Sequence, residues 1–165
     1  MIHLYWGDGK GKTTAAMGLA LRALGHERKV VIVQFLKDGS SGEIAGLRRL
    51  GATVYACPNA KFTWLMQEDE RAQARENGTA ALRKAVSDSY DLLILDEACA
   101  AWQHDLVDRS FLRQTVEGSS TRSEVVLTGR TPAPWMQDAA DYSTEMRACK
   151  HPYKQGVAAR EGIEY

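Results

Sequence analysis

Short apolar runs alternate with longer segments of helical periodicity along the 165 residues of the chain. The run VVIVQF at residues 30–35 is β-branched and continuous, which predicts a strand buried on both faces. Residues 13–24 are almost all apolar or small, which predicts a helix buried on several sides. The same reading predicts strands at residues 2–6, 52–56, 92–95, 124–127 and 142–146, and helices at residues 43–50 and 67–89. This alternation favours an α/β fold with a mostly parallel sheet and helices on both faces.

Composition and charge narrow the class of protein. Hydrophobic residues make up 44% and charged residues 25%, as in ordinary globular domains. Lys plus Arg is 21 and Asp plus Glu is 21, so a global basic field for nucleic acid is missing. The apolar stretches are too short or interrupted to span a bilayer, and the three cysteines fit neither a disulfide framework nor a zinc site. We therefore expect one cytoplasmic domain over residues 1–165, with no membrane or nucleic-acid partner.

The strongest local motif is the glycine-rich segment GDGKGKTT at residues 7–14, between the first expected strand and helix. Its glycines let successive backbone N–H groups point at phosphate oxygens, and Lys12 can reach the terminal phosphates. The Thr13 hydroxyl can take a position on Mg²⁺. Trp6 stands where the usual P-loop pattern has its first glycine, and the spacing is not that of a Rossmann fold. A flexible glycine turn is the alternative, which the GKTT ending and the strand–helix context disfavour.

Two further segments place polar residues after expected strands. DLLILDE at residues 91–97 is an apolar strand ending in Asp96 and Glu97, the form of a Walker B segment. At the carboxyl edge of a parallel sheet these acids can hold Mg²⁺ directly or through water. Arg130 follows the strand at residues 124–127, where its guanidinium can bind phosphate or carboxylate oxygens. Most arginines in such positions form surface ion pairs, so this motif alone is weak.

In this order the segments resemble the P-loop family of ATP:corrinoid adenosyltransferases. The resemblance covers essentially the whole chain. Its most specific part is the occurrence of LTGR, KHPY and GIEY, in this order, within a P-loop protein. The matching segments are GDGKGKTTAA (7–16), LALRALGH (19–26), VVIVQFLK (30–37), Gly42-Glu43, KFTW (61–64), DLLILDE (91–97), EVVLTGR (124–130) and residues 140–165.

The resemblance implies transfer of the 5′-deoxyadenosyl group from ATP to the cobalt of a reduced corrinoid, with triphosphate as the leaving group, in cobalamin biosynthesis or salvage. It implies that Thr13 and Glu97, with Asp96, bind Mg²⁺ or Mn²⁺. Phe62 and Trp64 match aromatic residues that pack on the corrin and displace its lower axial ligand, and with Lys12 and Arg130 they make up the implied catalytic set. The implied triphosphate-binding residues are Gly7, Asp8, Gly9, Lys10, Gly11, Lys12, Thr13, Thr14, Arg22 and Arg130.

The family also implies a homodimer and a reduced flavodoxin or flavin as electron donor. Lys61 departs from the family, in which a glycine is common at this position. Two other functions stay open from the residues alone. One is a different small P-loop enzyme, a kinase or a nucleotide hydrolase. The other is a nucleotide-dependent binding module without chemistry.

Overall fold

The computed structural model describes residues 1–57, 66–119, 121 and 123–163. In this part of the chain six strands form one sheet in the order β3-β2-β4-β5-β1-β6, and every pairing is parallel. The parallel α/β fold expected from the sequence is therefore confirmed. The strands are β1 (Ile2–Trp6), β2 (Val30–Gln34), β3 (Thr53–Ala56), β4 (Leu92–Asp96), β5 (Glu124–Gly129) and β6 (Tyr142–Glu145).

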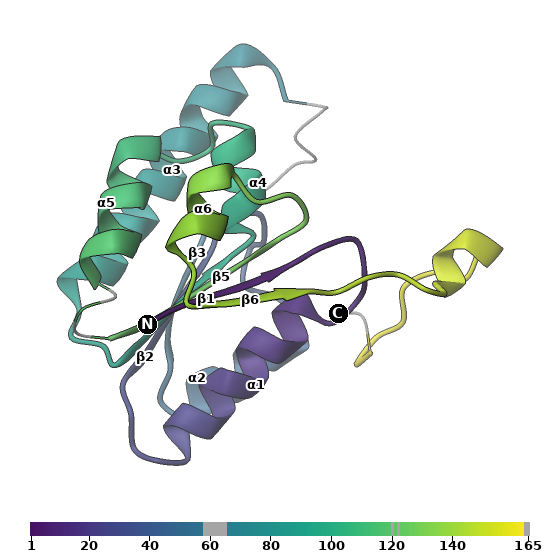
Figure 1. The fold of residues 1–165 in the computed structure, drawn as a ribbon, viewed down its shortest axis with the longest axis horizontal. Helices are drawn as coiled ribbons and strands as arrows, with labels where there is room; N and C mark the ends of the chain where they lie inside the picture. The colour runs from purple at the N-terminus through teal and green to yellow at the C-terminus, as the bar shows by residue number, and fades with distance from the viewer. Residues whose placement is uncertain (58–65, 120, 122, 164–165) are drawn as a thin grey trace.

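Helices cover both faces of the sheet (Figure 1). One face carries α1 (Lys12–Leu24) and α2 (Gly42–Arg49), and the other carries α3 (Glu68–Ser87), α4 (Ala98–Gln103), α5 (Arg109–Ser119) and α6 (Pro134–Ala139). Each face has its own hydrophobic core. After β6 the chain extends away from the sheet, forms a 3-10 turn at Pro152–Gln155 and returns toward the start of α1. No described helix is long and apolar enough to cross a membrane.

The two central strands explain where the polar residues collect. All five residues of β2 and all five of β4 are buried, because helices pack on both faces of these strands. The register pairs Gln34 with Asp96, so the last residues of the two strands lie side by side. Trp6 of β1 pairs with Gly129 of β5 at the same edge. The carboxyl ends of four neighbouring strands therefore meet at one edge of the sheet.

Two expectations from the sequence were wrong or incomplete. Residues 13–24 do form a helix, but only Ala16, Met17 and Ala20 of α1 are buried, and Leu21 is 54% exposed. These three residues form one stripe along the helix that packs on the sheet, and the rest of the helix surface is partly or fully exposed. The helices α4, α5 and α6 were not predicted. α4 and α6 have only 6 residues each, too few to show a clear helical period, whereas the 11 residues of α5 are enough to show one.

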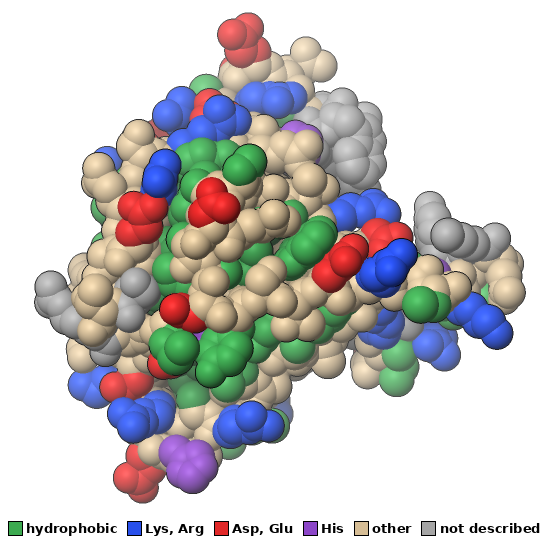
Figure 2. Space-filling view, viewed as in Figure 1, with side chains coloured by type: hydrophobic (Ala, Val, Ile, Leu, Met, Phe, Trp, Pro, Cys, Tyr) green, Lys and Arg blue, Asp and Glu red, His purple; other side chains and the backbone are tan. Residues whose placement is uncertain are grey.

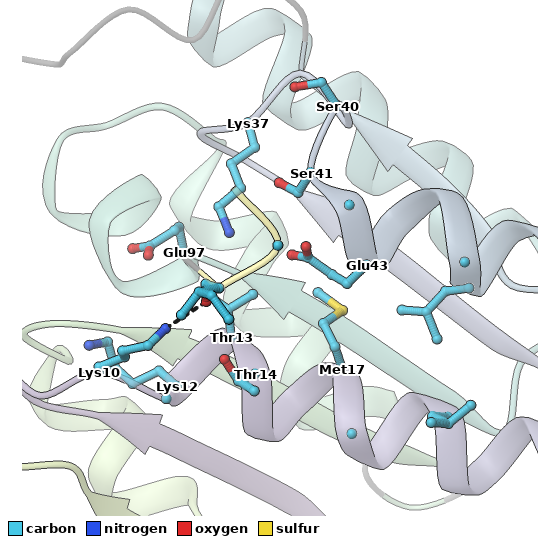
Figure 3. Close-up of a pocket in the computed structure, with 18 of the residues that line it drawn as sticks. Lys10, Lys12, Thr13, Thr14, Met17, Lys37, Ser40, Ser41, Glu43 and Glu97 are labelled. Carbon is cyan, nitrogen blue, oxygen red and sulfur yellow. Dashed lines mark hydrogen bonds between the residues drawn. The ribbon is translucent and has the colours of Figure 1, made fainter. Parts of the chain in front are cut away.

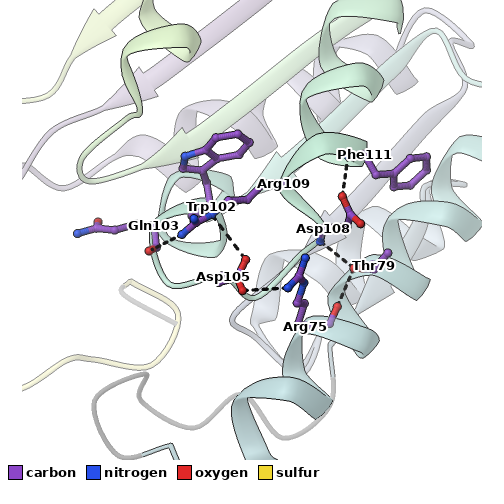
Figure 4. Close-up of polar contacts among 8 residues, drawn as sticks. All are labelled: Arg75, Thr79, Trp102, Gln103, Asp105, Asp108, Arg109 and Phe111. Atoms are coloured by element: carbon purple, nitrogen blue, oxygen red, sulfur yellow. Dashed lines mark hydrogen bonds and ion pairs between the residues drawn. The ribbon is translucent and has the colours of Figure 1, made fainter. Parts of the chain in front are cut away.

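A polar network ties the helices on this second face together (Figure 4). Asp105 receives hydrogen bonds or ion pairs from Arg75 of α3 at 3.1 Å and from Arg109 of α5 at 3.6 Å. The Arg109 guanidinium also donates to the carbonyl oxygens of Trp102 and Gln103, at the carboxyl end of α4. Asp105 has a φ of 57°, in the left-handed region that Asp tolerates better than most residues.

The surface agrees with the balanced charge. Figure 2 shows that acidic and basic side chains of the described residues are interspersed on the face in view, with both signs mixed. A formal net charge of zero fits this pattern.

Candidate functional site

A cleft of about 1620 Å³ opens at the carboxyl edge of the sheet (Figure 3). One wall is the glycine-rich loop with the first half of α1, and the other is the segment after β2 with α2. Glu97 lies between them, and the C-terminal segment contributes its own residues. The lining residues are 8–14, 17, 18, 21, 36–38, 40–43, 46, 47, 50, 97, 151, 162 and 163.

The loop requires glycine for two physical reasons. Gly7 and Gly11 have φ values of 113° and 117°, which L-residues with a side chain rarely adopt. A Cβ on Gly9 would lie 2.7 Å from the carbonyl oxygen of Met146, so the loop can pack on β6 only without a side chain there. Two backbone hydrogen bonds hold the loop in this position. The Gly9 N–H donates to the carbonyl oxygen of Met146, just after β6, at 2.7 Å, and the Gly7 N–H donates to the carbonyl oxygen of Arg130, just after β5, at 3.1 Å.

Positive charge gathers on this loop. The Lys12 ammonium donates to the Gly9 carbonyl at 2.7 Å, which keeps it over the loop (Figure 3). Lys10 donates to the carbonyl oxygen of Ile163 at 2.9 Å, so the C-terminal segment contacts the loop directly. The first turn of α1 contains no acidic residue, and its N–H groups and dipole therefore present a positive end to the cleft. Together these groups give this wall of the cleft a positive surface that is suited to an anion.

Asp96 is the centre of the polar contacts behind the loop. It is fully buried, and four described side chains donate hydrogen bonds to it. Its Oδ1 accepts from the hydroxyls of Thr13 at 2.9 Å and Thr128 at 2.7 Å. Its Oδ2 accepts from the Lys37 ammonium at 3.0 Å and the Gln34 amide at 3.4 Å. A buried carboxylate without hydrogen-bond donors is costly, so these contacts explain how Asp96 is accommodated in the interior.

Glu97 is held in an unusual backbone conformation beside Asp96. Its φ is 61°, which is strained for a residue with a side chain, and its N–H donates to the Thr128 hydroxyl at 2.9 Å. Burial raises the pKa of the Glu97 carboxyl, and the Asp96 charge raises this pKa further. Lys37 and Lys12 act in the opposite direction. The side chain lines the cleft, where a bound cation would favour its charged form.

The oxygen atoms of this site fit a divalent cation that is bound together with phosphates. No group of three or more His, Cys, Asp or Glu that could hold a metal occurs among the described residues. The Asp96 and Glu97 carboxylates and the Thr13 hydroxyl are hard oxygen donors of the type that Mg²⁺ prefers. Mg²⁺ usually takes its remaining ligands from nucleotide phosphates and water. The donor set is therefore suited to a nucleotide-bound Mg²⁺.

Other candidate residues lie outside the cleft or outside the described residues. Arg22 is exposed in the last turn of α1, ten residues after Lys12, which is about 15 Å along a helix. The Arg130 side chain is exposed, and neither arginine is among the residues that line the cleft. Phe62 and Trp64 fall within residues 58–65, outside the described residues. The roles of these four residues stay predictions.

The sequence reading missed three residues of the site. Lys37 and Thr128 bind Asp96, and Glu43 extends from α2 into the cleft (Figure 3). Lys37 and Thr128 each lie at or just after the carboxyl end of a strand. Residues at the carboxyl ends of parallel strands face the ligand crevice. This position alone indicates Lys37 and Thr128 as site candidates, just as it indicates Asp96.

The fold and the site define a P-loop nucleotide-binding protein, in which a glycine-rich loop enters a helix whose threonine meets a buried strand-end carboxylate. The family model described as "ATP:corrinoid adenosyltransferase BtuR/CobO/CobP" matches residues 1–165. The chain belongs to this family.

Full-length relatives agree. A corrinoid adenosyltransferase of Pseudomonas aeruginosa is 37% identical over 169 residues, covering 100% of this chain and 83% of that protein. The corrinoid adenosyltransferase of Escherichia coli K12 is 34% identical, with 100% and 85% covered. Corrinoid adenosyltransferase CobA of Salmonella typhimurium is 31% identical, again with 100% and 85% covered. A solved Aeropyrum pernix ORC2 protein is similar over 90% of this chain and 42% of that one, with TM-score 0.47 and 16% identity, too remote for any inference.

Proposed function

We propose that this protein transfers the 5′-deoxyadenosyl group of ATP to the cobalt of a reduced corrinoid and releases triphosphate. The observation that carries the proposal is the full-length family match, together with a phosphate loop whose Thr13 contacts the buried Asp96 at 2.9 Å. Lys10, Lys12 and the N-terminus of α1 gather cationic groups where a triphosphate would bind.

The reaction makes modest chemical demands on the protein. A Co(I) corrinoid is itself the nucleophile and carries no proton, so its attack on the ribose 5′ carbon needs no general base. The protein has to align the two substrates and stabilise the charge that develops on the leaving triphosphate. Lys12 and the backbone N–H groups of the loop do this from one side of the cleft. The loop thus holds the triphosphate as a leaving group, and no phosphoryl group is transferred.

Asp96, Glu97 and Thr13 are the residues that would hold Mg²⁺ or Mn²⁺. Bound there, the ion would neutralise part of the triphosphate charge. Asp96 keeps the Thr13 hydroxyl oriented, and Thr128 keeps Asp96 and the Glu97 backbone in place.

Phe62 and Trp64 are proposed to pack against the corrin and to exclude its lower axial ligand. Cobalt without that ligand is much easier to reduce from Co(II) to Co(I). The electron would come from a reduced flavodoxin or flavin. The substrate is either complete cobalamin or a precursor such as cobyrinic acid a,c-diamide.

The family pattern also supports a cytoplasmic homodimer, in which the partner subunit can complete the corrinoid site. Sedimentation equilibrium of the purified protein measures the association directly. A mass of about 18.2 kDa at all concentrations would exclude the dimer.

The deciding experiment incubates the protein with ATP, Mg²⁺ and chemically reduced cobalamin. Adenosylcobalamin is followed by its visible absorbance, and the phosphorus products are separated by ³¹P NMR. Adenosylcobalamin with intact triphosphate in equal amounts supports the proposal. Release of orthophosphate or pyrophosphate without corrinoid product would instead support a hydrolase, and binding without turnover would support a binding module.

A further inference from the structure

We propose that Lys37 is a further triphosphate-binding residue, which a divalent cation releases from Asp96 when the nucleotide binds. The inference rests on one part of the proposed function, the binding of a metal–triphosphate group in the cleft. It adds a cation on the wall of the cleft opposite Lys12.

The position of Lys37 follows from the sheet. β2 is the neighbour of β4, and the register sets Gln34 beside Asp96. Lys37 comes three residues after Gln34, and its side chain turns back over the end of β4, where its ammonium lies 3.0 Å from Oδ2 of Asp96. In Figure 3 it enters the cleft from the side of β2, whereas Lys10 and Lys12 enter from the loop.

The two partners differ sharply in exposure. The Asp96 side chain is fully buried, but that of Lys37 is 32% exposed and lines the cleft. The ammonium therefore has the carboxylate on one side and the open cleft on the other. A flexible four-carbon stem allows it to turn from one to the other without moving the backbone.

The two oxygens of Asp96 are not equivalent. Oδ1 accepts from the hydroxyls of Thr13 and Thr128 at 2.9 and 2.7 Å. Oδ2 is bound by Lys37 and, at the longer distance of 3.4 Å, by Gln34. A cation that approaches Asp96, directly or through a water, has to share Oδ2 with the Lys37 ammonium. Like charges repel at this distance, so the metal and Lys37 exclude one another at Asp96.

The displaced ammonium has a natural partner. A triphosphate on the loop carries several negative charges, and Lys37 reaches it from the side that Lys12 leaves open. Lysine is well suited to this contact, because it binds phosphate oxygens as a mobile point charge. Lys37 then contributes to charge stabilisation on the leaving group, opposite the contribution of Lys12.

Lys37 could instead serve only as a fixed counter-ion for the buried Asp96. The two roles predict different results for Lys37→Met. If Lys37 is a fixed counter-ion, its removal leaves the Asp96 carboxylate without a cationic partner and lowers the stability of the protein. It does not make metal binding tighter and triphosphate binding weaker at the same time. The exchange role predicts changes of opposite sign: tighter metal binding without nucleotide, and weaker triphosphate binding.

The test uses the full-length protein and two titrations. Mn²⁺ binding without nucleotide is measured by electron paramagnetic resonance, and we expect the Lys37→Met variant to bind about fivefold more tightly, as loss of a nearby like charge predicts. Binding of tripolyphosphate with Mg²⁺ is measured by calorimetry, and we expect it to weaken about tenfold or more, as loss of a charge-assisted hydrogen bond predicts. Lys37→Arg should recover most of the triphosphate affinity.

Lys29→Met is the matched control, because Lys29 is exposed just before β2, at the opposite edge of the sheet. It should change neither titration. If Lys37→Met fails to fold by circular dichroism, Lys37→Gln keeps a donor for Asp96 and takes its place. Unchanged or weaker Mn²⁺ binding, or unchanged tripolyphosphate binding, would overturn the inference. Neither titration contains a corrinoid. The expected results for Lys37 can therefore be obtained even if the protein does not transfer an adenosyl group, and the two proposals are tested separately.

Discussion

The hydroxyl of Thr128 donates a hydrogen bond to Oδ1 of Asp96 at 2.7 Å, and both side chains are fully buried. The same hydroxyl oxygen accepts the N–H of Glu97 at 2.9 Å. One side chain on β5 therefore holds both acids at the end of β4, including the Glu97 backbone in its left-handed conformation.

Replacement of Thr128 by Val should expose how much this hydroxyl contributes. Val has nearly the same shape, but it leaves the Glu97 N–H without its acceptor and Asp96 without one donor. We expect the free energy of unfolding to fall by about 1 to 3 kcal/mol, together with weaker Mg-ATP binding. Urea denaturation and calorimetry measure the two effects. Thr128→Ser keeps the hydroxyl and should stay near wild type, and equal stability of the Val and Ser variants would contradict this role.

Gly9 offers a test of the loop packing. In Gly9→Ala the new Cβ would lie 2.7 Å from the Met146 carbonyl oxygen, so the loop must move away from β6. We expect ATP binding to be lost or reduced at least about tenfold, since the movement displaces Lys10, Lys12 and the N-terminus of α1 from their positions at the cleft. Gly118→Ala is the control, because a Cβ built there has no heavy atom within 4 Å apart from its chain neighbours and the backbone of its own helix. Fluorescence or calorimetric titration with ATP checks both, and normal affinity in Gly9→Ala would show that the loop tolerates the shift.

The cysteines give a prediction about pH. Burial raises the pKa of Cys57 to about 11 and that of Cys99 to about 12, whereas Cys149 is exposed. At pH 8 a thiol reagent such as Ellman's reagent should label Cys149 rapidly and the two buried thiols only after denaturation. Cys149→Ser should abolish the rapid phase.

The same shifts predict how stability depends on pH. A raised thiol pKa means that the folded protein keeps the proton while the unfolded chain loses it near the ordinary value of 9.0. The contribution is therefore fully present below pH 9 and is lost as pH rises through about 9 to 12. Denaturation of wild type and of Cys57→Ala at pH 7 and pH 10 measures it, and an equal loss in both would assign the pH effect to other groups.

Two substitutions at Asp105 distinguish the contribution of its backbone conformation to stability from that of its charge. Asp105→Asn removes the ion pairs to Arg75 and Arg109 but keeps a residue that tolerates a positive φ. Because these groups are partly exposed, we expect a loss of less than about 1 kcal/mol that shrinks in high salt. Asp105→Ala adds the backbone cost and should lose more. ATP affinity should stay unchanged in both, and an equal effect of the two substitutions would assign the whole loss to charge.

Trp64→Ala tests the proposed role of the aromatic pair in reduction. Activity with Co(II) corrinoid and an external reductant should be abolished, because the axial ligand is no longer excluded. Much of the activity with preformed Co(I) corrinoid should survive. Equal loss in the two assays would contradict this role.

The sheet and the loop were predictable because their signals are local. A continuous run of β-branched apolar residues, such as residues 30–33, indicates a buried strand, and GKTT after a strand indicates a phosphate loop. The contact of Thr128 with Asp96 was not predictable in this way. It depends on strand order, which places β5 beside β4 although 32 residues separate the two side chains. The exposure of Leu21 was missed for a related reason, because apolar composition does not tell which face of a helix the sheet covers.

The end of β5 also contacts the other half of the site. Gly129 packs directly on Cys99, and the carbonyl of Arg130 accepts the N–H of Gly7. Three consecutive residues, Thr128 and Gly129 of β5 and Arg130 directly after it, thus connect to the acids on one side and to the lysine-bearing loop on the other. The spacing between these two halves is built into a rigid element, so an incoming nucleotide meets a pre-organised receptor and loses little affinity to the entropy of assembling it.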